Sequence, residues 1–491
     1  MAADIEHVVV LMLENRSFDN MLGMLYPSDG SFNGLTGLET NDYFGQPVKV
    51  WSSKTMDDAA ATVPNPDPGE YFTDMNQQLF GGQTPAVPAP MSGFVANYLD
   101  QPKEQPEDIA SRLERFVATT IERKTKPSYD IHSPMHYFLP EQVPVISKLA
   151  RAFGVCDQWH ASAPCQTWPN RFFAHTGTAL GFVNNKDFHI PFAAPSIFGR
   201  LRAKDKSWRV YYHDLPQSIM LADVWPEAPL HYRFFKQFLV DAHSGVLPSY
   251  SFIEPRYFSD LFLREIPNDE HPPHNVLFGE KLIAQVYNAV RASPSWKKTL
   301  LIITWDEHGG CYDHAPPPQA LVPDGHAQDG FPFNRYGVRV PAVIISPYIP
   351  AGSKIRAAPL GLPQAGPPYP FDHTSILATV RALFKLGDPL THRDAVAPTL
   401  LSALSLPLPI NDGPCTVGGV TPKVSTPATQ VGASATPNDM QASLARMAAS
   451  LPRRTPLMAV PEPVAMVERA HDTVAAALAD SAIRLKDFLN V

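Results

Sequence analysis

Two strongly apolar segments run directly into carboxylate and amide side chains, and this pattern most constrains the fold. Thr299–Thr304 is apolar or β-branched without alternation, which is typical of a strand covered by helices on both faces. Asp306–Glu307 follow it, just as Glu14–Asn15 follow the apolar run Ile5–Leu13. Ligands of open α/β sheets bind beyond the carboxyl ends of the strands. The sequence therefore predicts an α/β fold, a mainly parallel sheet sandwiched by helices, with a polar site at one edge.

Composition places this chain among globular proteins with a large core. It has 491 residues, of which 44% are hydrophobic and 18% charged, and its 52 prolines indicate much irregular, stiff loop. The net charge of -8 forms no basic stripe, so nucleic acid is not expected as a partner. The apolar runs fall short of the roughly 20 residues that a transmembrane helix needs, so no transmembrane segment is expected.

The ends and the cysteines give weaker indications. Residues 1–5 lack a basic leader region, which predicts a cytoplasmic protein as given, or a secreted or periplasmic one if a leader has been removed. The four cysteines lack CxxC spacing, although Cys156 and Cys165 could form a bridge.

The chain divides into a predicted catalytic domain and a tail. Residues 1–404 form the domain, with an irregular insertion at about 25–127 whose many aromatic residues suggest a wall or lid around a site. A Pro/Ser/Thr/Gly linker at 405–437 leads to an amphipathic helical tail at 438–491. The tail's apolar stripe is expected to dock on the body or on a twin subunit, which would make a homo-oligomer.

Hydrophobic periodicity predicts the other elements, and Asp372 is expected to cap the helix that follows it. Helices are expected at Ser17–Met24, Leu113–Arg123, Tyr137–Phe153, Asn170–Thr176, Val276–Ala292, Ile376–Leu386, Met440–Leu451 and Val464–Leu489, and strands at Ser207–Pro216 and Tyr336–Ile349.

A hydroxyl stands at a predicted helix start. In CQTWPNRFFAHTG, Pro169 suits the first turn of a helix, which places Thr167 at or just before the N-cap. Free backbone N–H groups and the positive end of the helix dipole at this point favour an alkoxide and a bound phosphate. Thr167 could therefore be a nucleophile, or an ordinary helix cap.

Four histidines stand in or next to predicted loops. His213 closes the strand Ser207–Pro216, His271 and His274 share the segment PNDEHPPHN, and His314 follows the turn after Glu307. Each could serve acid–base chemistry or could simply be a structural hydrogen-bonding residue.

Four segments together resemble one family: ENRSFD from Glu14, TWPNR from Thr167, HP at His271, and DEHGG with Asp313–His314. The segments ISPYI and FDHTS agree with it. The resemblance is to the phosphoesterase family of bacterial phospholipases C and related acid phosphatases, a branch of the alkaline-phosphatase-like superfamily. It covers roughly residues 5 to 403 and leaves out the tail.

The resemblance implies a metal-dependent phosphoric-ester hydrolase with a phospho-threonine intermediate on Thr167. It implies one divalent metal ion, which the oxygen donors would make Ca²⁺ or Mg²⁺ more readily than Zn²⁺. His271 and His213 would hold the phosphate or protonate the leaving oxygen. The metal ligands would be Glu14, Asn15, Asp306, Glu307 and Thr167, and the residues binding substrate would be Asn170, Arg171, His274 and His314.

This chain departs from the family pattern at Glu70. Phospholipase-like members tend to carry a histidine after an Asp-Pro-Gly turn, whereas this chain has DPGEYF, which puts acid catalysis from that loop in doubt. The substrate could be a phospholipid or a soluble phosphomonoester. A catalytically inactive metal-binding or interaction protein on the same fold is the alternative.

Overall fold

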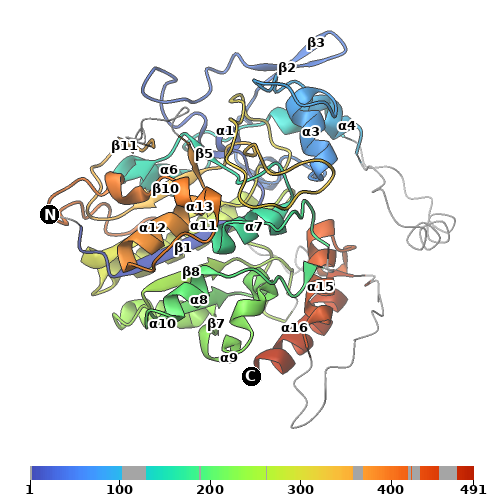
Figure 1. Ribbon diagram of the computed structural model, residues 1–491. Helices are drawn as coiled ribbons and strands as arrows, with labels where there is room; N and C mark the ends of the chain where they lie inside the picture. Colours follow the sequence, from blue (N-terminus) through green and yellow to red (C-terminus); the bar gives the residue numbers. More distant parts are fainter. Residues whose placement is uncertain are drawn as a thin grey trace.

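An eight-stranded sheet forms the centre of the protein, in the order β11-β4-β10-β9-β1-β8-β6-β7 (Figure 1). The computed structural model describes residues 3–101, 129–186, 189–260, 262–357, 369–418, 422, 432–452, 471 and 473–490. The sheet strands are β1 (His7–Leu13), β4 (Gly154–Val155), β6 (Trp208–Tyr212), β7 (Tyr232–Phe234), β8 (Tyr250–Glu254), β9 (Thr299–Trp305), β10 (Ala342–Ile345) and β11 (Ser353–Lys354). Two small sheets pair β2 (Thr40–Tyr43) with β3 (Gln46–Lys49), and β5 (Trp159–His160) with β12 (Phe371–Asp372).

The sheet is mainly parallel, as predicted. Strands β9, β1, β8, β6 and β7 run in one direction, whereas β10 is antiparallel to both of its neighbours. All residues of β9 are buried, and β1 is buried after its first residue. Their apolar sequences lack alternation because both faces of the sheet are covered.

Helices cover the two faces and complete the predicted sandwich. On one face, α6 (Pro144–Ala152) contacts β10 and α10 (Phe235–His243) contacts β6. On the same face, α11 (Val276–Ala292) contacts both β1 and β9. On the other face lie α7 (Thr167–Thr176), α8 (Ile197–Arg202) and α12 (Thr374–Phe384) (Figure 1). Aromatic rings join this second layer to the sheet: His175 of α7 meets Phe252 of β8 with ring centroids 4.5 Å apart.

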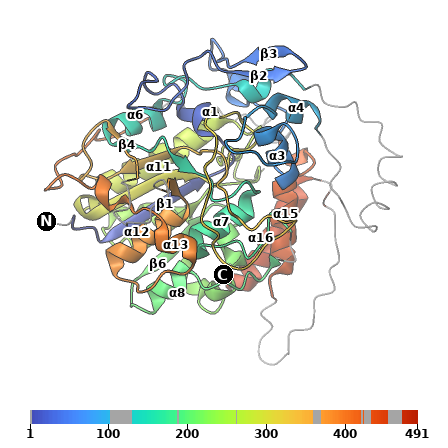
Figure 2. The same cartoon turned by 45° about the horizontal axis from the view of Figure 1, so that its top comes forward.

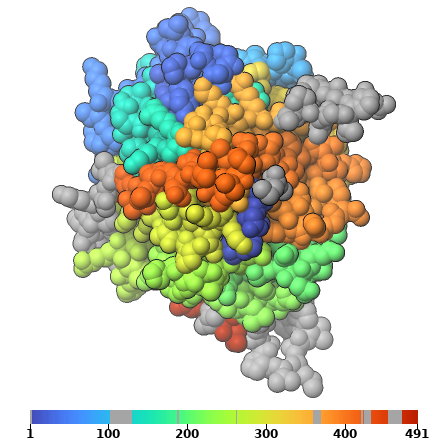
Figure 3. Space-filling model, turned by 90° about the vertical axis from the view of Figure 1, so that its left-hand side faces the viewer, coloured from blue at the N-terminus to red at the C-terminus, as the bar shows by residue number. Residues whose placement is uncertain are grey.

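Short helices complete the body. They are α1 (Phe18–Leu22), α2 (Asp58–Ala61), α3 (Phe72–Phe80), α4 (Phe94–Leu99), α9 (Ala228–His231) and α13 (His392–Val396), with 3-10 turns at Ser133–Met135, Gln217–Met220, Ala222–Val224, Trp296–Lys298 and Leu400–Ala403. Figure 3 faces the side where the dark blue start of the chain leads into β1, and the carboxyl ends of the parallel strands point away from this side.

The described part of the insertion folds against the body. Residues 25–101 include the β2–β3 hairpin and α2 to α4, and they share a small core with the body that includes Leu35, Leu79, Phe94, Tyr312 and Val338. The helix predicted at Leu113–Arg123 lies outside the described residues.

The tail contains two helices, α15 (Asp439–Ser450) and α16 (Val474–Leu489), that lie side by side (Figures 1 and 2). Their apolar faces pack on the body: Met440 and Leu444 join the main core, and the ring of Phe488 meets that of Trp225 at 5.7 Å. Docking on the body is therefore observed, while a homo-oligomer stays a prediction. Among the described residues, no helix has the length and apolarity to cross a membrane.

Several predicted elements differ from the structure. The helix expected at Tyr137–Phe153 begins only at Pro144, because proline lacks the N–H that earlier turns would need and suits the first helical position. The strand expected at Tyr336–Ile349 shrinks to β10. The described part of the helix expected at Val464–Leu489 begins at Val474, with Thr473 as its N-cap.

The remaining corrections concern single side chains. His373 is the N-cap of α12, and Asp372 instead accepts a hydrogen bond from the Ser162 hydroxyl at 2.8 Å. The bridge considered between Cys156 and Cys165 is absent, since both are buried free thiols.

Candidate active site

The carboxyl ends of β1 and β9 meet at one edge of the sheet. Leu13 is paired with Trp305 in the parallel ladder, so the residues that follow the two strands emerge side by side. The Asp306 carboxylate joins the two turns, because its Oδ1 accepts the backbone N–H of Asn15 at 3.0 Å and that of Glu307 at 2.8 Å. The two strand ends therefore form one polar site, as predicted.

Thr167 reaches this edge from the N-terminus of α7. Its Oγ1 lies 3.4 Å from Glu14 Oε2 and 3.4 Å from Asn15 Oδ1, and all three residues are buried. Gln166 is the N-cap, so the helix starts slightly earlier than predicted and Thr167 is its first residue. The hydroxyl accordingly lies where the free N–H groups of the first turn concentrate positive potential.

The Asn170 side chain fixes the loop that carries Thr167. Its Nδ2 donates to the carbonyl oxygens of Ala163, Cys165 and Gln166, with the Cys165 bond at 2.8 Å. Asn170 was predicted to bind substrate, but the structure places it in a supporting position within the helix.

Asn15 holds a backbone conformation that few residues adopt. Its φ of 52° lies in the left-handed region, which asparagine tolerates better than most residues do. The side chain is anchored by donation from Nδ2 to Glu70 Oε1 at 2.5 Å and to Glu307 Oε1 at 3.0 Å. This leaves Oδ1 facing Thr167. Gly309 allows the close approach of the second turn, since a Cβ there would lie 2.3 Å from the Asn15 carbonyl oxygen.

Arg171, one helical turn after Thr167, connects the carboxylates beneath the hydroxyl. Its guanidinium lies 2.5 Å from Glu14 Oε1, 3.1 Å from Asp306 Oδ2 and 3.9 Å from Glu254 Oε2. It is only 2% exposed. Although burial lowers the pKa of Arg171, the neighbouring carboxylates of Glu14, Asp306 and Glu254 outweigh that effect and raise it, so it stays charged. Arg171 is predicted to bind substrate, but its side chain points into the protein.

The carboxylates at this edge carry more negative charge than their protein partners balance. Burial raises the pKa of Glu14 well above its usual value, with Arg171 opposing that shift. Burial, with the neighbouring Glu70 and Asp306, likewise raises the pKa of Glu307. The histidine beside Glu307 offers little charge, because burial lowers the pKa of His308 to about 3.

This donor set fits a divalent cation. The Thr167 Oγ1 atom lies 3.4 Å from Glu14 Oε2 and 3.4 Å from Asn15 Oδ1, close to the roughly 3 to 3.5 Å that separates neighbouring ligands at metal–oxygen distances of about 2.1–2.5 Å. A cation would also remove the cost of burying the unbalanced carboxylates. Oxygen donors favour a hard ion such as Ca²⁺ or Mg²⁺.

His271 reaches the site through the insertion. Its Nε2 lies 3.3 Å from Glu70 Oε1, and its Nδ1 lies 3.8 Å from Asp67 Oδ1. Ligand atoms of the three side chains lie within 4.8 Å of one another, so this group could also hold a metal. Burial alone would lower the pKa of His271, but Glu70 and Asp67 outweigh it and raise the pKa well above its usual value. A protonated His271 thus lies beside the residue that anchors Asn15.

Two predicted histidines are bound to other groups of the protein. His213 Nδ1 lies 2.9 Å from the Glu254 carbonyl oxygen, its ring stacks on Phe235, and burial lowers its pKa to about 3. His274 Nδ1 lies 2.7 Å from Asp269 Oδ1.

His314 belongs to a separate group. Its Nδ1 lies 2.6 Å from Asp19 Oδ2, its Nε2 lies 3.0 Å from Asn33 Oδ1, and Arg339 pairs with both Asp19 and Asp313. The two aspartates and His314 could hold a metal by spacing. The Arg339 guanidinium contacts both carboxylates and His314 contacts one of them, so we interpret this group as a brace between α1 and the turn after β9.

Comparison with known proteins shows the family of this chain. A family model described as "Phosphoesterase family" matches residues 5–387. The chain belongs to this family. This phosphoesterase is 35% identical over 488 residues to non-specific phospholipase C6 of Arabidopsis thaliana, covering 96% of this chain and 86% of the relative. It is 27% identical over 465 residues to phospholipase C A of Mycobacterium tuberculosis, covering 83% of this chain and 78% of the relative.

A solved structure of a protein in the alkaline phosphatase superfamily from Vibrio parahaemolyticus aligns at a TM-score of 0.30 and 12% identity, covering 52% of this chain and 63% of that chain. This likeness is too weak to inform the site. Family membership confirms the predicted class, a hydrolase acting on phosphoric esters.

Sequence reasoning missed several residues of this phosphoesterase's site. Gln217 Nε2 donates to Glu14 Oε1 at 2.8 Å, and His373 Nε2 lies 2.6 Å from the Asp306 carbonyl oxygen. Asp67 and Glu70 enter from the insertion. The sequence signal for Glu70 is its place after the Asp-Pro-Gly turn, where this chain departs from the family pattern.

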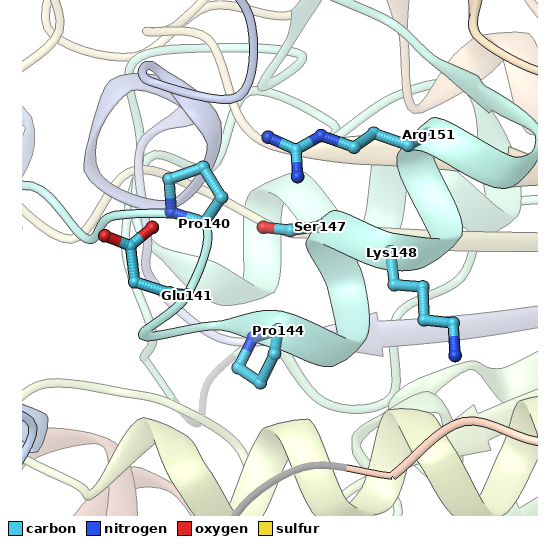
Figure 4. A pocket seen from close by; sticks show the side chains of 6 residues that line it. All are labelled: Pro140, Glu141, Pro144, Ser147, Lys148 and Arg151. Carbon is cyan, nitrogen blue, oxygen red and sulfur yellow. The ribbon is translucent and has the colours of Figure 1, made fainter.

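A surface hollow of about 320 Å³ lies away from this site, over α6 (Figure 4). The hollow is lined by Pro140, Glu141, Pro144, Ser147, Lys148 and Arg151. None of these lining residues is among the site residues described above.

Proposed function

We propose that this chain is a phospholipase C-like phosphoesterase that uses Thr167 as its nucleophile and depends on one divalent cation. The observation that carries the proposal is the position of the Thr167 hydroxyl, 3.4 Å from both Glu14 Oε2 and Asn15 Oδ1 at the start of α7. The names of the relatives favour a phospholipid diester over a phosphomonoester as substrate.

The first chemical step needs a proton to leave Thr167 Oγ1. Glu14 Oε2 lies within reach of that proton, 3.4 Å from the hydroxyl oxygen. The oxygen attacks phosphorus, the bond to the leaving oxygen breaks, and the phosphoryl group passes to Thr167. The first-turn N–H groups of α7 would stabilise its oxygens. Water then cleaves the phospho-threonine and restores the hydroxyl.

Glu14, Asn15, Asp306, Glu307 and Thr167 would hold the cation. A divalent ion bound there would lower the pKa of the hydroxyl and offset charge on the phosphoryl oxygens. Arg171 keeps Glu14 and Asp306 in place from below.

His271 is suited to protonate the leaving oxygen. It is held by Glu70 and Asp67, and its raised pKa keeps it protonated near neutral pH. The site would then need no histidine at position 70, because Glu70 would act by orienting His271 and Asn15.

Replacing His271 by asparagine is expected to affect substrates according to their leaving group. Turnover of phosphatidylcholine, whose alkoxide leaving group needs a proton, should fall about 10²- to 10⁴-fold. Turnover of p-nitrophenyl phosphorylcholine should fall less than about tenfold, because p-nitrophenolate leaves without protonation. Steady-state rates on the two substrates provide the measurement.

The matched control is His326→Asn, whose side chain is 56% exposed and paired with Asp324. It should change neither rate. Equal losses on both substrates in the His271 variant would contradict an acid role and indicate a general positioning effect.

The proposed function is tested by hydrolysis of p-nitrophenyl phosphate and p-nitrophenyl phosphorylcholine, side by side across pH, with metal removed by chelation and restored. The diester should be preferred, and chelation should abolish activity until Ca²⁺, Mg²⁺ or Zn²⁺ is returned. Preference for the monoester with an acid optimum would instead indicate an acid phosphatase.

The alternative, a catalytically inactive metal-binding or interaction protein, predicts no turnover of either substrate. Binding of metal without hydrolysis of any phosphoester would favour it. The alignment of Thr167 with Glu14 and Asn15 supports the enzyme instead.

A further inference from the structure

A fully exposed apolar side chain projects from a turn whose base connects to the candidate site. Phe262 is 99% exposed and Leu263 is 59% exposed, at the tip of a turn between Asp260 and Glu265. Arg264, also exposed, follows them. Most large apolar side chains in the described residues are buried, so two adjacent exposed ones at a turn tip are unusual.

The tip is held in shape by its own turn. Asp260 Oδ1 accepts the N–H groups of Phe262 at 2.8 Å and Leu263 at 2.9 Å, and backbone hydrogen bonds join Asp260 and Glu265 in both directions. At the base, Arg256 pairs with Glu265 at 2.5 Å. The apolar side chains are therefore presented outward on a braced support.

The base of this turn connects to residues of the candidate site. Arg256 and Asn268 exchange hydrogen bonds through the Asn268 side chain at 2.6 Å and its backbone N–H at 3.0 Å. The next residue, Asp269, accepts the Glu14 N–H at 2.8 Å, and His271 lies only three positions from Asn268, at most about 10 Å of chain. Gln441 of α15 donates to the Tyr257 carbonyl oxygen at 2.8 Å, and this bond holds the segment that leads into the turn.

We propose that Phe262 and Leu263 insert into the surface of a phospholipid bilayer and bring the site to its substrate. The inference rests on the proposed function, because a phospholipid reaches the site from a bilayer. Arg264 beside the tip would lie at the level of the headgroup phosphates. The pair offers at most a few hundred Å² of surface, whereas a stable protein interface buries about 1,200–2,000 Å² in total, so a bilayer suits it better than a second copy or another protein.

The test uses the full chain with the double substitution Phe262→Ser and Leu263→Ser. Sedimentation with phosphatidylcholine vesicles, in a Thr167→Ala background that spares the lipid, measures binding apart from catalysis. Affinity should fall roughly tenfold for each side chain lost, about 100-fold together. In the active background, hydrolysis of vesicles should fall similarly at low lipid, while monomeric p-nitrophenyl phosphorylcholine should turn over at the parent rate.

Phe44→Ser is the matched control. Phe44 is 90% exposed at the turn joining β2 to β3, so it has the same chemistry at a different place. It should leave vesicle affinity unchanged. Unchanged affinity in the double variant, equal loss in the control, or a parent dimer that the double variant separates would each overturn the inference.

The outcomes separate this inference from the proposed function. Loss of vesicle binding in the double variant of a chain that hydrolyses no phosphoester would support the bilayer contact and reject the proposed function. Hydrolysis of the soluble diester without any vesicle binding by the parent chain would overturn the bilayer contact and leave the proposed function standing.

Discussion

Thr167→Ala is expected to lower kcat for phosphodiester hydrolysis by at least about 10⁴-fold, because it removes the atom that would attack phosphorus. The Thr167 hydroxyl lies 3.4 Å from Glu14 Oε2 and Asn15 Oδ1, at the first residue of α7. Binding of substrate should change far less, since the carboxylates and the helix terminus remain. Steady-state kinetics on p-nitrophenyl phosphorylcholine and on phosphatidylcholine would measure both effects.

Thr167→Ser is the matched control, because it retains a hydroxyl and loses only a methyl group. We expect it to keep activity within roughly a factor of ten to a hundred of the parent, as the freer rotation of serine places the oxygen less often. Rapid quenching during turnover should trap the phosphorylcholine group on residue 167 in the parent and in the serine variant. Equal turnover by the alanine variant would remove Thr167 from the mechanism.

The sequence predicted the framework of the site well because strands and their ends are local features. The apolar runs before Glu14 and Asp306 became neighbouring parallel strands, and helix α11 has the predicted bounds, Val276–Ala292. Asn15 and Glu307 come shortly after these strands, so their closeness follows from the pairing of β1 with β9. Each of these depends on a few consecutive residues and on the polarity of parallel strands.

What the sequence did not predict depends on contacts between distant segments. Glu70 meets Asn15 across 55 positions, and Gln217 meets Glu14 across 203. A periodic pattern carries no information about which loop folds over a site. A proline also marks a wrong helix boundary. The apolar periodicity places Pro144 inside a helix, but proline lacks the N–H that an interior position needs, and α6 begins at this residue.

For two polar residues of α7, the sequence predicted a place near the site but not where the side chain points. Asn170 and Arg171 stand in the same helix as Thr167, yet one supports the preceding loop and the other pairs with carboxylates inside the protein. Their direction follows from where α7 crosses the sheet. All ten residues of α7 are buried, so this helix has no solvent-exposed face toward which a polar side chain could point.

Arg171→Met is expected to lower the free energy of unfolding by about 3–5 kcal/mol, the usual cost of leaving buried charges without their partner. The side chains of Glu14, Asp306 and Glu254 are fully buried around the guanidinium. Arg171→Lys should lose less stability than Arg171→Met but more than none, because an ammonium keeps the charge yet lacks the planar fork of donors with which a guanidinium reaches separated carboxylates. Midpoints of urea unfolding, monitored by tryptophan fluorescence, would measure the effect.

Arg202→Met is the matched control, since Arg202 pairs with Asp223 and Glu227 at 39% exposure and should cost less than about 1 kcal/mol. A similarly small loss at Arg171 would contradict the assignment of its guanidinium as the central counter-charge. The comparison also reports on the cation without any activity assay. If Glu14 and Asp306 are metal ligands, added Ca²⁺ or Mg²⁺ should recover part of the stability lost in Arg171→Met, because the ion would balance the same two carboxylates that the guanidinium leaves behind.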